Sequence, residues 1–539
     1  MRLKGLIDER PWLVFPIALM ALILPILVIE LQVARATGGT FMYPLDDTFI
    51  HMTVAKTLAL HGNWGIAAGE FESASSSVGY TLLLAALFRI FSVHAYIPFA
   101  VNLAASVVLL WVVDVRLIRE RVRPAARLLV LLAVVVLVPL PVLVISGMEH
   151  SLQCLFSFLF LFGISDFLAA EDEQRGRKFP ISLYVYALCA CMMRYEGAFL
   201  VGIACLLLLY KRRVGNAFLL GFIGALPIAV FGVYSIMKGS YFLPNSVLLK
   251  SEGARLSLRG LASFLFQQVE QKLTISISGI ATTVTQHLLI ILPLTYLLLA
   301  GPLKKAVRHS YVLLMLVAAA FLQLTLAATG WFYRYEAYLV LCTVYILLVL
   351  FYQNREALMA KLRAYPLAGF FLLFGLFLPT VYRSAAAFSK AGTACMNIYD
   401  QQYQMAKFLH TYYDNEVVAV NDIGAVSYFK KEKNLDLWGL ADINVARSKK
   451  ENYCTPVFLD SLSRSEKAGV AIVFDSWFSD SLLSKWNKVA TWTIPNNVIC
   501  QDSTVTFYAI DKSKTGELKS NLEQYQSALP YGVHVRYFN

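Results

Sequence analysis

The sequence predicts a polytopic α-helical membrane protein that ends in a soluble α/β domain. Its 539 residues are 58% hydrophobic and only 15% charged, with a mean hydropathy of +0.60, whereas a soluble protein of this length carries about a quarter charged residues. Long apolar runs separated by short basic clusters fill the chain up to residue 385, which is the pattern of repeated membrane spans. After residue 386, short β-branched and aromatic runs alternate with polar stretches typical of helices.

Eleven membrane spans are expected, several of them shorter than the roughly 20 residues that a spanning helix needs. The first is interpreted as an uncleaved span, because the apolar region of a signal peptide is only about 7–15 residues long. The spans are placed near 12–33, 98–118, 127–146, 151–169, 180–193, 197–210, 216–237, 276–300, 309–328, 335–352 and 365–385.

The basic clusters predict a cytoplasmic N-terminus and an extracytoplasmic C-terminus. Alternate segments between the spans each hold three to five Lys or Arg residues, and such an excess marks cytoplasmic loops. If the apolar stretch 75–91 were counted as a span, the orientation of the following basic clusters would be reversed. It is therefore expected to lie at the outer surface. The predicted domains are therefore a transmembrane domain over 1–385, with an outer loop over 34–97, and an extracytoplasmic α/β domain over 386–539.

Two further predictions follow from composition. Much of the net charge of +12 lies in the clusters that set topology, so nucleic acid is not an expected partner and the lipid bilayer is. Three of the eight cysteines, Cys395, Cys454 and Cys500, fall in the outer domain. One disulfide among them is compatible with that compartment, and the sequence does not choose the pair.

The first outer loop carries two adjacent carboxylates, Asp46 and Asp47, in the segment YPLDDTFIHM (43–52). In one interpretation both are solvated and open the short helix that DDTFIHMTVAKTLALHG predicts, since Asp is favoured at helix N-caps. That interpretation leaves the pair unexplained, because neighbouring carboxylates repel each other. The alternative is that the pair serves a reaction.

The other outer loops supply candidate substrate-binding residues. Arg-Tyr-Glu occurs twice, at 194–196 and 334–336, each time at the outer start of a span. An aromatic belt with snorkelling arginines accounts for part of this pattern, but ionisable groups at this depth usually indicate function. Basic groups can meet a phosphate, and acidic groups can orient a sugar or an acceptor hydroxyl. The candidates are His51, Glu149, Arg194, Glu196, Asn245, Lys250, Arg334 and Glu336.

The first outer loop resembles that of the GT-C glycosyltransferases, membrane enzymes that take a sugar from a polyprenyl-phosphate carrier. The resemblance begins with YPLDDTFIHMTVAKTLALHGNWGI and GEFESASSSVGYTLLLAALFRIF. It continues through SGMEH, RYEGAFL, LPNSVLLK, VAVNDIGAVSYF and LDLWGLAD, and so covers most of the chain. The chain looks closest to bacterial relatives of the mycobacterial terminal arabinofuranosyltransferases, which implies a GT-C-like transmembrane catalytic domain of about 11 helices.

The resemblance implies an inverting glycosyltransferase on the outer face of the bacterial cytoplasmic membrane. The donor would be a polyprenyl-phosphate sugar, with a pentofuranose such as arabinose implied by the subfamily. The acceptor would be a cell-envelope glycan, a lipid-linked glycan or a protein. By resemblance Asp46 is the base that activates the acceptor hydroxyl, and Asp47 orients it.

The leaving phosphate needs electrostatic stabilisation, for which Arg194, Lys250 and Arg334 are the candidates. No cofactor is expected, and a divalent metal stays compatible with the sequence. Two other functions remain open: a transporter or flippase of lipid-linked sugars, and an envelope assembly protein without catalysis. A transporter binds its substrate near the bilayer midplane, whereas polar residues here gather in the outer loops.

Overall fold

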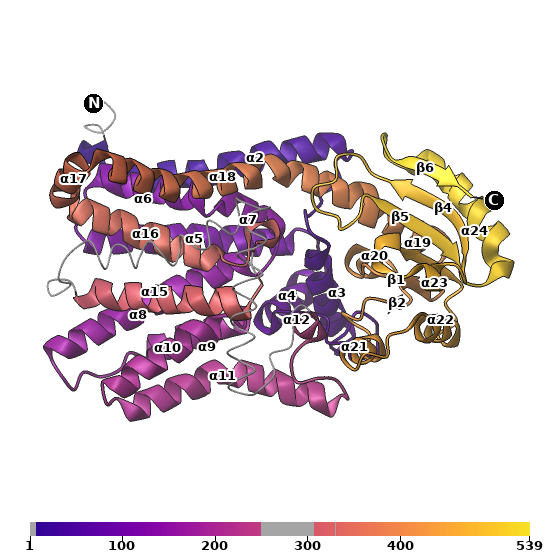
Figure 1. Cartoon of the computed structure of the whole chain (residues 1–539), viewed down its shortest axis with the longest axis horizontal. Helices are drawn as coiled ribbons and strands as arrows, with labels where there is room; N and C mark the ends of the chain where they lie inside the picture. Colours follow the sequence, from indigo (N-terminus) through magenta and orange to yellow (C-terminus); the bar gives the residue numbers. More distant parts are fainter. Residues whose placement is uncertain (1–6, 250–306, 329, 539) are drawn as a thin grey trace.

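The computed structural model describes residues 7–249, 307–328 and 330–538. It has two parts, a helical bundle and an α/β domain at one end of that bundle (Figure 1). The described helices of the bundle are α2 (Val14–Ala36, after the 3-10 turn Pro11–Leu13), α5 (Ile97–Arg119), α6 (Pro124–Leu137), α7 (Leu140–Ser146), α8 (His150–Glu173), α9 (Ile181–Met193), α10 (Gly197–Tyr210), α11 (Val214–Met237), α15 (Val307–Leu326), α16 (Ala337–Gln353) and α18 (Pro366–Ile398).

The protein is a multi-pass membrane protein by the length and apolarity of these helices. Among the described residues, five helices are long and apolar enough to cross a membrane alone, or six if α6 and α7, which meet at 44°, form one span. Ten of the eleven predicted spans coincide with described helices, and the one over 276–300 lies outside the described residues. The number eleven stays a prediction, because α9, α10 and α16 are short.

Contacts at one end of the bundle join the segments predicted to be cytoplasmic. The Ala125 amide donates to Asp8 at 3.0 Å, and Arg213 binds Glu171 with donor–acceptor distances of 3.0 and 2.6 Å. The helix α17 (Arg355–Ala364) lies at the same end (Figure 1). The predicted inner segments that the structure describes therefore share one side.

The opposite end carries α3 (Asp46–His61), α4 (Val78–Phe91) and α12 (Asn245–Leu248). These helices lie between the bundle and the α/β domain (Figure 1), and α4 packs on α3. The helix over the predicted surface segment 75–91 is thus placed with the outer loop rather than among the long helices. Ser77 caps α4 through its side chain, which accepts from the Tyr80 amide.

The α/β domain is built on one six-stranded sheet of order β2-β1-β3-β5-β4-β6. The strands β1, β2 and β3 pair in parallel, while β5, β4 and β6 add antiparallel pairs. Both faces are covered by helices, as parallel strands require. The strands are β1 (Val418–Val420), β2 (Asn434–Asp436), β3 (Val470–Val473), β4 (Asn487–Thr493), β5 (Thr504–Ala509) and β6 (His534–Tyr537), and the helices are α19 (Gln404–Tyr412), α20 (Gly424–Phe429), α21 (Ile443–Lys450), α22 (Pro456–Ser465), α23 (Asp480–Leu483) and α24 (Thr515–Tyr525).

The long helix α18 links the two parts. It runs the length of the bundle and enters the α/β domain (Figure 1), so the predicted boundary at 385/386 falls inside one continuous helix. All eight cysteines are free thiols, including Cys395, Cys454 and Cys500. The disulfide considered from the sequence is therefore absent from the structure.

Candidate active site

The two carboxylates of the first outer loop have separate partners. The Asp46 side chain accepts from the backbone amides of Gly424 and Ala425, each at 2.8 Å, and so binds the first turn of α20 in the α/β domain. The Asp47 carboxylate pairs instead with the guanidinium of Arg334, which follows the 3-10 turn Trp331–Tyr333. Asp47 keeps 25% of its side chain exposed, whereas Arg334 keeps 1%.

The protonation of Asp46 is tied to a third carboxylate. Burial of the Asp46 carboxyl group and the charge of Asp422 raise its pKa to about 8, against the opposing effect of the Ala425 and Gly424 amides. Burial also raises the pKa of Asp422 to about 6, although the Gln402 amide donates to it at 2.9 Å and lowers that pKa. Both carboxyl groups therefore favour the protonated form more than an exposed aspartate does, and their titrations are linked.

A second group of buried polar residues lies under α4. Arg194 follows α9, and its Nε and Nη2 atoms donate to the Glu196 carboxylate at 3.1 and 2.7 Å. Its Nη1 atom donates to Glu149 at 3.0 Å. The other Glu149 oxygen is 3.6 Å from the His51 ring. Burial opposes ionisation of Glu149, but His150, His51 and Arg194 hold its pKa down at about 2, so this carboxylate is charged.

Tyr335 joins the two groups. The Arg334 guanidinium lies 5.0 Å from the centre of its ring and that of Arg194 lies 5.3 Å from it, while the His150 ring is 5.9 Å away. Two guanidinium groups thus share one aromatic side chain, which favours cations on its faces. Asp47 and Glu149 balance their charge.

Several polar atoms of this region have no partner within the described part of the chain. They include Nε and Nη1 of Arg334, Nη1 of Arg383, and both ring nitrogens of His150. A buried polar atom without a partner costs about 1–3 kcal/mol, so this group of polar atoms marks a candidate site for a polar ligand.

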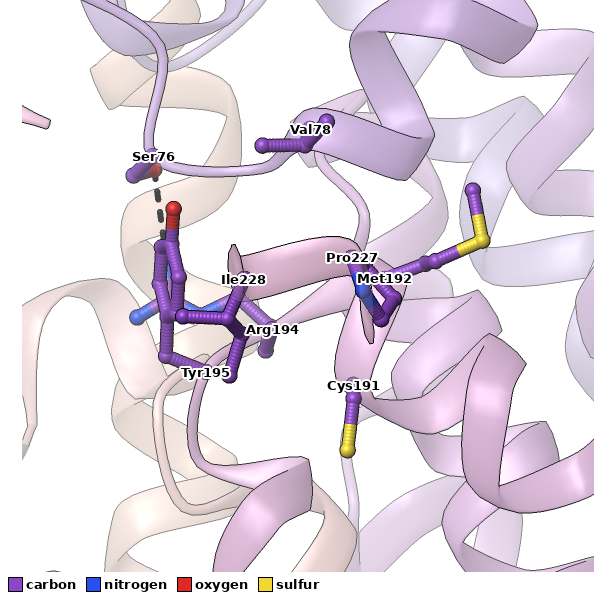
Figure 2. A pocket seen from close by; sticks show the side chains of 8 residues that line it. All are labelled: Ser76, Val78, Cys191, Met192, Arg194, Tyr195, Pro227 and Ile228. Atoms are coloured by element: carbon purple, nitrogen blue, oxygen red, sulfur yellow. Dashed lines mark hydrogen bonds between the residues drawn. The ribbon is translucent and has the colours of Figure 1, made fainter. Parts of the chain in front are cut away.

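A pocket adjoins Arg194 (Figure 2). Ser76, Arg194 and Tyr195 form its polar side, and Figure 2 shows the Ser76 hydroxyl facing Arg194, at 3.4 Å. The remaining walls are apolar and come from α4, α9 and α11: Val78, Cys191, Met192, Pro227 and Ile228. The pocket therefore has one polar side, which includes Arg194, and apolar walls.

Comparisons with known proteins address the fold. A family model described as a domain of unknown function, DUF8728, matches residues 396–508, and no curated protein matches the chain. The structure is similar to the crystal structure of ArnT from Cupriavidus metallidurans bound to undecaprenyl phosphate, with a TM-score of 0.51, 11% identity, and coverage of 92% of this chain and 98% of that one. The chain has a GT-C-like fold.

An oligosaccharyltransferase from Archaeoglobus fulgidus, solved in the apo form, is also similar, with a TM-score of 0.45 and 12% identity. That match covers 91% of this chain and 74% of the other. The likeness to ArnT covers 92% of this chain, and so extends over the bundle and the α/β domain together.

The GT-C-like structure brings most of the predicted site residues together. His51, Glu149, Arg194 and Glu196 form one network, and Asp47 with Arg334 lies beside it. Asn245 is buried at the start of α12, where its amide atoms have no partner among the described residues.

The remaining candidates stand apart. Glu336 pairs with Arg383 at 3.0 Å and accepts from the Gly330 amide, so it does not pair with its neighbour Arg334. Lys250 lies outside the described residues. In the part of the chain that the structure describes, no group of three His, Cys, Asp or Glu side chains has the arrangement to hold a metal ion.

Sequence reasoning missed Asp422, Gln402 and Arg383. Asp422 lies in the segment NDIGAVSYF, which the resemblance includes without giving it a role. Arg383 lies within a predicted span, and a charged residue there was a signal for a buried partner. The sequence could not predict that Glu336 is the partner of Arg383, because several acidic residues near the ends of the spans were possible partners.

Proposed function

We propose that the protein is a glycosyltransferase that moves a sugar from a polyprenyl-phosphate donor to an acceptor at the outer face of the cytoplasmic membrane. The observation that carries this proposal is the convergence of Arg194 and Arg334 on Tyr335, beside the Asp47 carboxylate that pairs with Arg334. Two guanidinium groups at one place can bind the oxygens of a lipid phosphate.

The leaving group in this reaction is the lipid phosphate. Charge grows on its oxygens as the bond to the sugar breaks, and preorganised cations stabilise that charge. Arg334 supports this role because two of its nitrogens are buried and have no partner in the described chain. The similar ArnT structure holds undecaprenyl phosphate, which supports the same class of lipid here.

Asp47 is the base in this proposal, in place of Asp46, to which the resemblance gives that role. A base must accept a proton from the acceptor, and the Asp47 carboxylate, paired with Arg334, keeps part of its side chain exposed. Asp46 instead binds the amides of α20, and burial and the charge of Asp422 raise its pKa. A single base and no enzyme nucleophile imply one displacement, with inversion at the anomeric carbon.

The finer assignments rest on the resemblance of the sequence. It supports a pentofuranose such as arabinose as the sugar and an envelope glycan, a lipid-linked glycan or a protein as the acceptor. It also supports the bacterial cytoplasmic membrane, with the α/β domain outside. The positive-inside pattern adds to this orientation.

The test is turnover of defined polyprenyl-phosphate sugars by the purified protein in detergent. Asp47→Asn should lower transfer by about 10²–10⁴-fold, the usual cost of losing a general base, while binding of the bare lipid phosphate persists. Asp166→Asn is the matched control, since Asp166 also pairs with an arginine, at the other end of the bundle. Wild-type turnover by Asp47→Asn, or no turnover of any donor by the wild type, would refute the assignment.

A further inference from the structure

Two tryptophans meet at the edge of the sheet where its parallel strands end. Trp438 follows β2 by two residues, and Trp477 lies in the 3-10 turn Asp475–Trp477 that follows β3. The strand β1 lies between β2 and β3, so both loops flank the carboxyl end of β1. Ligands of open α/β sheets bind outside the carboxyl ends of the strands.

The two indoles pack against each other at a tilt, and this pair with Lys449 is called the stack below. Their ring centres are 4.0 Å apart at an angle of 38°, and the Lys449 ammonium lies 3.3 Å from the centre of the Trp438 ring. A ring and an ammonium this close cannot occupy the same side, so they cover opposite faces of Trp438. Phe474 lies edge-on to Trp477, at 74° and 5.6 Å.

Backbone hydrogen bonds fix both loops. The Asp436 carboxylate accepts from the amides of Trp438, Gly439 and Ala441 at 2.7–3.0 Å. Lys449 donates to the Trp438 carbonyl at 2.8 Å, and the Asn421 side chain accepts from the Phe474 amide at 2.8 Å. The stack is thus held in place before any ligand arrives, which reduces the entropy cost of binding.

The indoles are only half-buried, although they are among the largest apolar side chains of the domain. Their rings contact each other, Phe474 and the Lys449 ammonium, and Trp477 also packs against the buried core. A half-buried tryptophan at the surface of a domain is typical of a recognition surface.

This edge of the sheet faces the candidate active site. Asp422 lies two residues after the end of β1, and the amide of Gly424, two residues further on, donates to Asp46. On the other side of the stack, Arg447 of α21 donates to the Gly239 carbonyl after α11 at 3.1 Å. The stack thus lies on the domain surface next to the first outer loop.

We propose that Trp477, backed by Trp438, is the platform on which a sugar ring of a glycan acceptor stacks. This inference rests on the proposed function and names its acceptor class. One face of a sugar ring presents C–H groups that pack on an indole, and its hydroxyls accept from indole N–H groups. A peptide acceptor would add to a free strand edge, and β2 is an edge strand of the sheet, so peptides are the alternative that the test below separates from saccharides.

The test is saturation-transfer NMR of the full-length protein in detergent. The probes are methyl glycosides and oligosaccharides of arabinose, galactose, glucose, mannose and rhamnose, with a peptide set beside them. Trp477→Ala should weaken binding of the responding saccharide by about tenfold, and Trp477→Phe should restore most of it. Trp12→Ala is the control, because Trp12 is a 68% exposed tryptophan at the N-terminal end.

The outcomes separate this inference from the proposed function. Thermal unfolding of Trp477→Ala and Trp438→Ala reports whether a loss of binding reflects a loss of fold, and Trp477→Phe decides the case if alanine destabilises the domain. Saccharide signals equal in wild type and Trp477→Ala, or signals from peptides alone, would overturn the platform. Hydrolysis of the donor by water needs no acceptor and so does not involve the tryptophan stack. If the wild type does not hydrolyse the donor, that result counts against the proposed function and not against the platform.

Discussion

At the residue scale, the two Arg-Tyr-Glu triplets have the same sequence, but their charged side chains form ion pairs with different partners. Arg194 binds Glu196 of its own triplet, and its backbone is extended, at φ −152° and ψ 142°. Arg334 is helical, at φ −102° and ψ −38°, so Glu336 is directed elsewhere and binds Arg383. The sequence predicted both arginines as site residues but could not predict these partners.

The difference predicts a stronger dependence of lipid binding on Arg334 than on Arg194. Arg334→Ala should weaken binding of bare undecaprenyl phosphate by about 10–100-fold, the usual value of charged hydrogen bonds. Arg334→Lys should restore little, since lysine lacks the planar fork. Arg116→Ala, which removes an arginine paired with Asp166 at the other end of the bundle, is the control. Unchanged lipid affinity in Arg334→Ala, with a lower unfolding temperature, would mean that Arg334 serves only to neutralise Asp47.

At the element scale, α3 and α20 depend on each other across the two parts of the chain. The helical period and the acidic start predicted α3 correctly as a short helix, but Asp46 binds the amides of α20 rather than those of its own helix. A sequence gives local propensity, whereas contacts between residues 378 positions apart depend on how the domains pack. The role of Asp46 therefore could not be predicted from its neighbours.

This contact predicts that Gly424 tolerates no side chain. A Cβ atom there would lie 2.1 Å from the backbone oxygen of Asp46, so Gly424→Ala must push α20 away from α3. Such overpacking costs about 1–3 kcal/mol, and we expect a lower unfolding temperature and faster proteolysis between the bundle and the α/β domain. Gly516→Ala in α24 meets nothing within 4 Å and should behave as wild type. Equal stability of the two variants would contradict a tight α3–α20 contact.

At the scale of the whole molecule, composition was enough to predict a helical bundle followed by an α/β domain, because hydropathy separates the two environments. Strand order was not predictable, since β1, β2 and β3 are each only three or four residues long and pair with strands distant in sequence. The boundary at 385/386 followed a change in composition, whereas α18 continues to Ile398 as one helix. A membrane span that extends into water loses its apolar pattern before its helix ends.

The orientation of the molecule is the last prediction. Contacts such as Arg213–Glu171 and Ala125–Asp8 gather the basic segments at one end, and the α/β domain lies at the other (Figure 1), so the positive-inside rule places that domain outside. In intact spheroplasts of a Cys454→Ser background, which removes a half-buried native thiol, Ser520→Cys should react with an impermeant thiol reagent. Arg175→Cys, in the exposed turn after α8, should react only after the membrane is opened. The reverse pattern would put Asp47 and the tryptophan stack in the cytoplasm, where an outer-face acceptor cannot reach them.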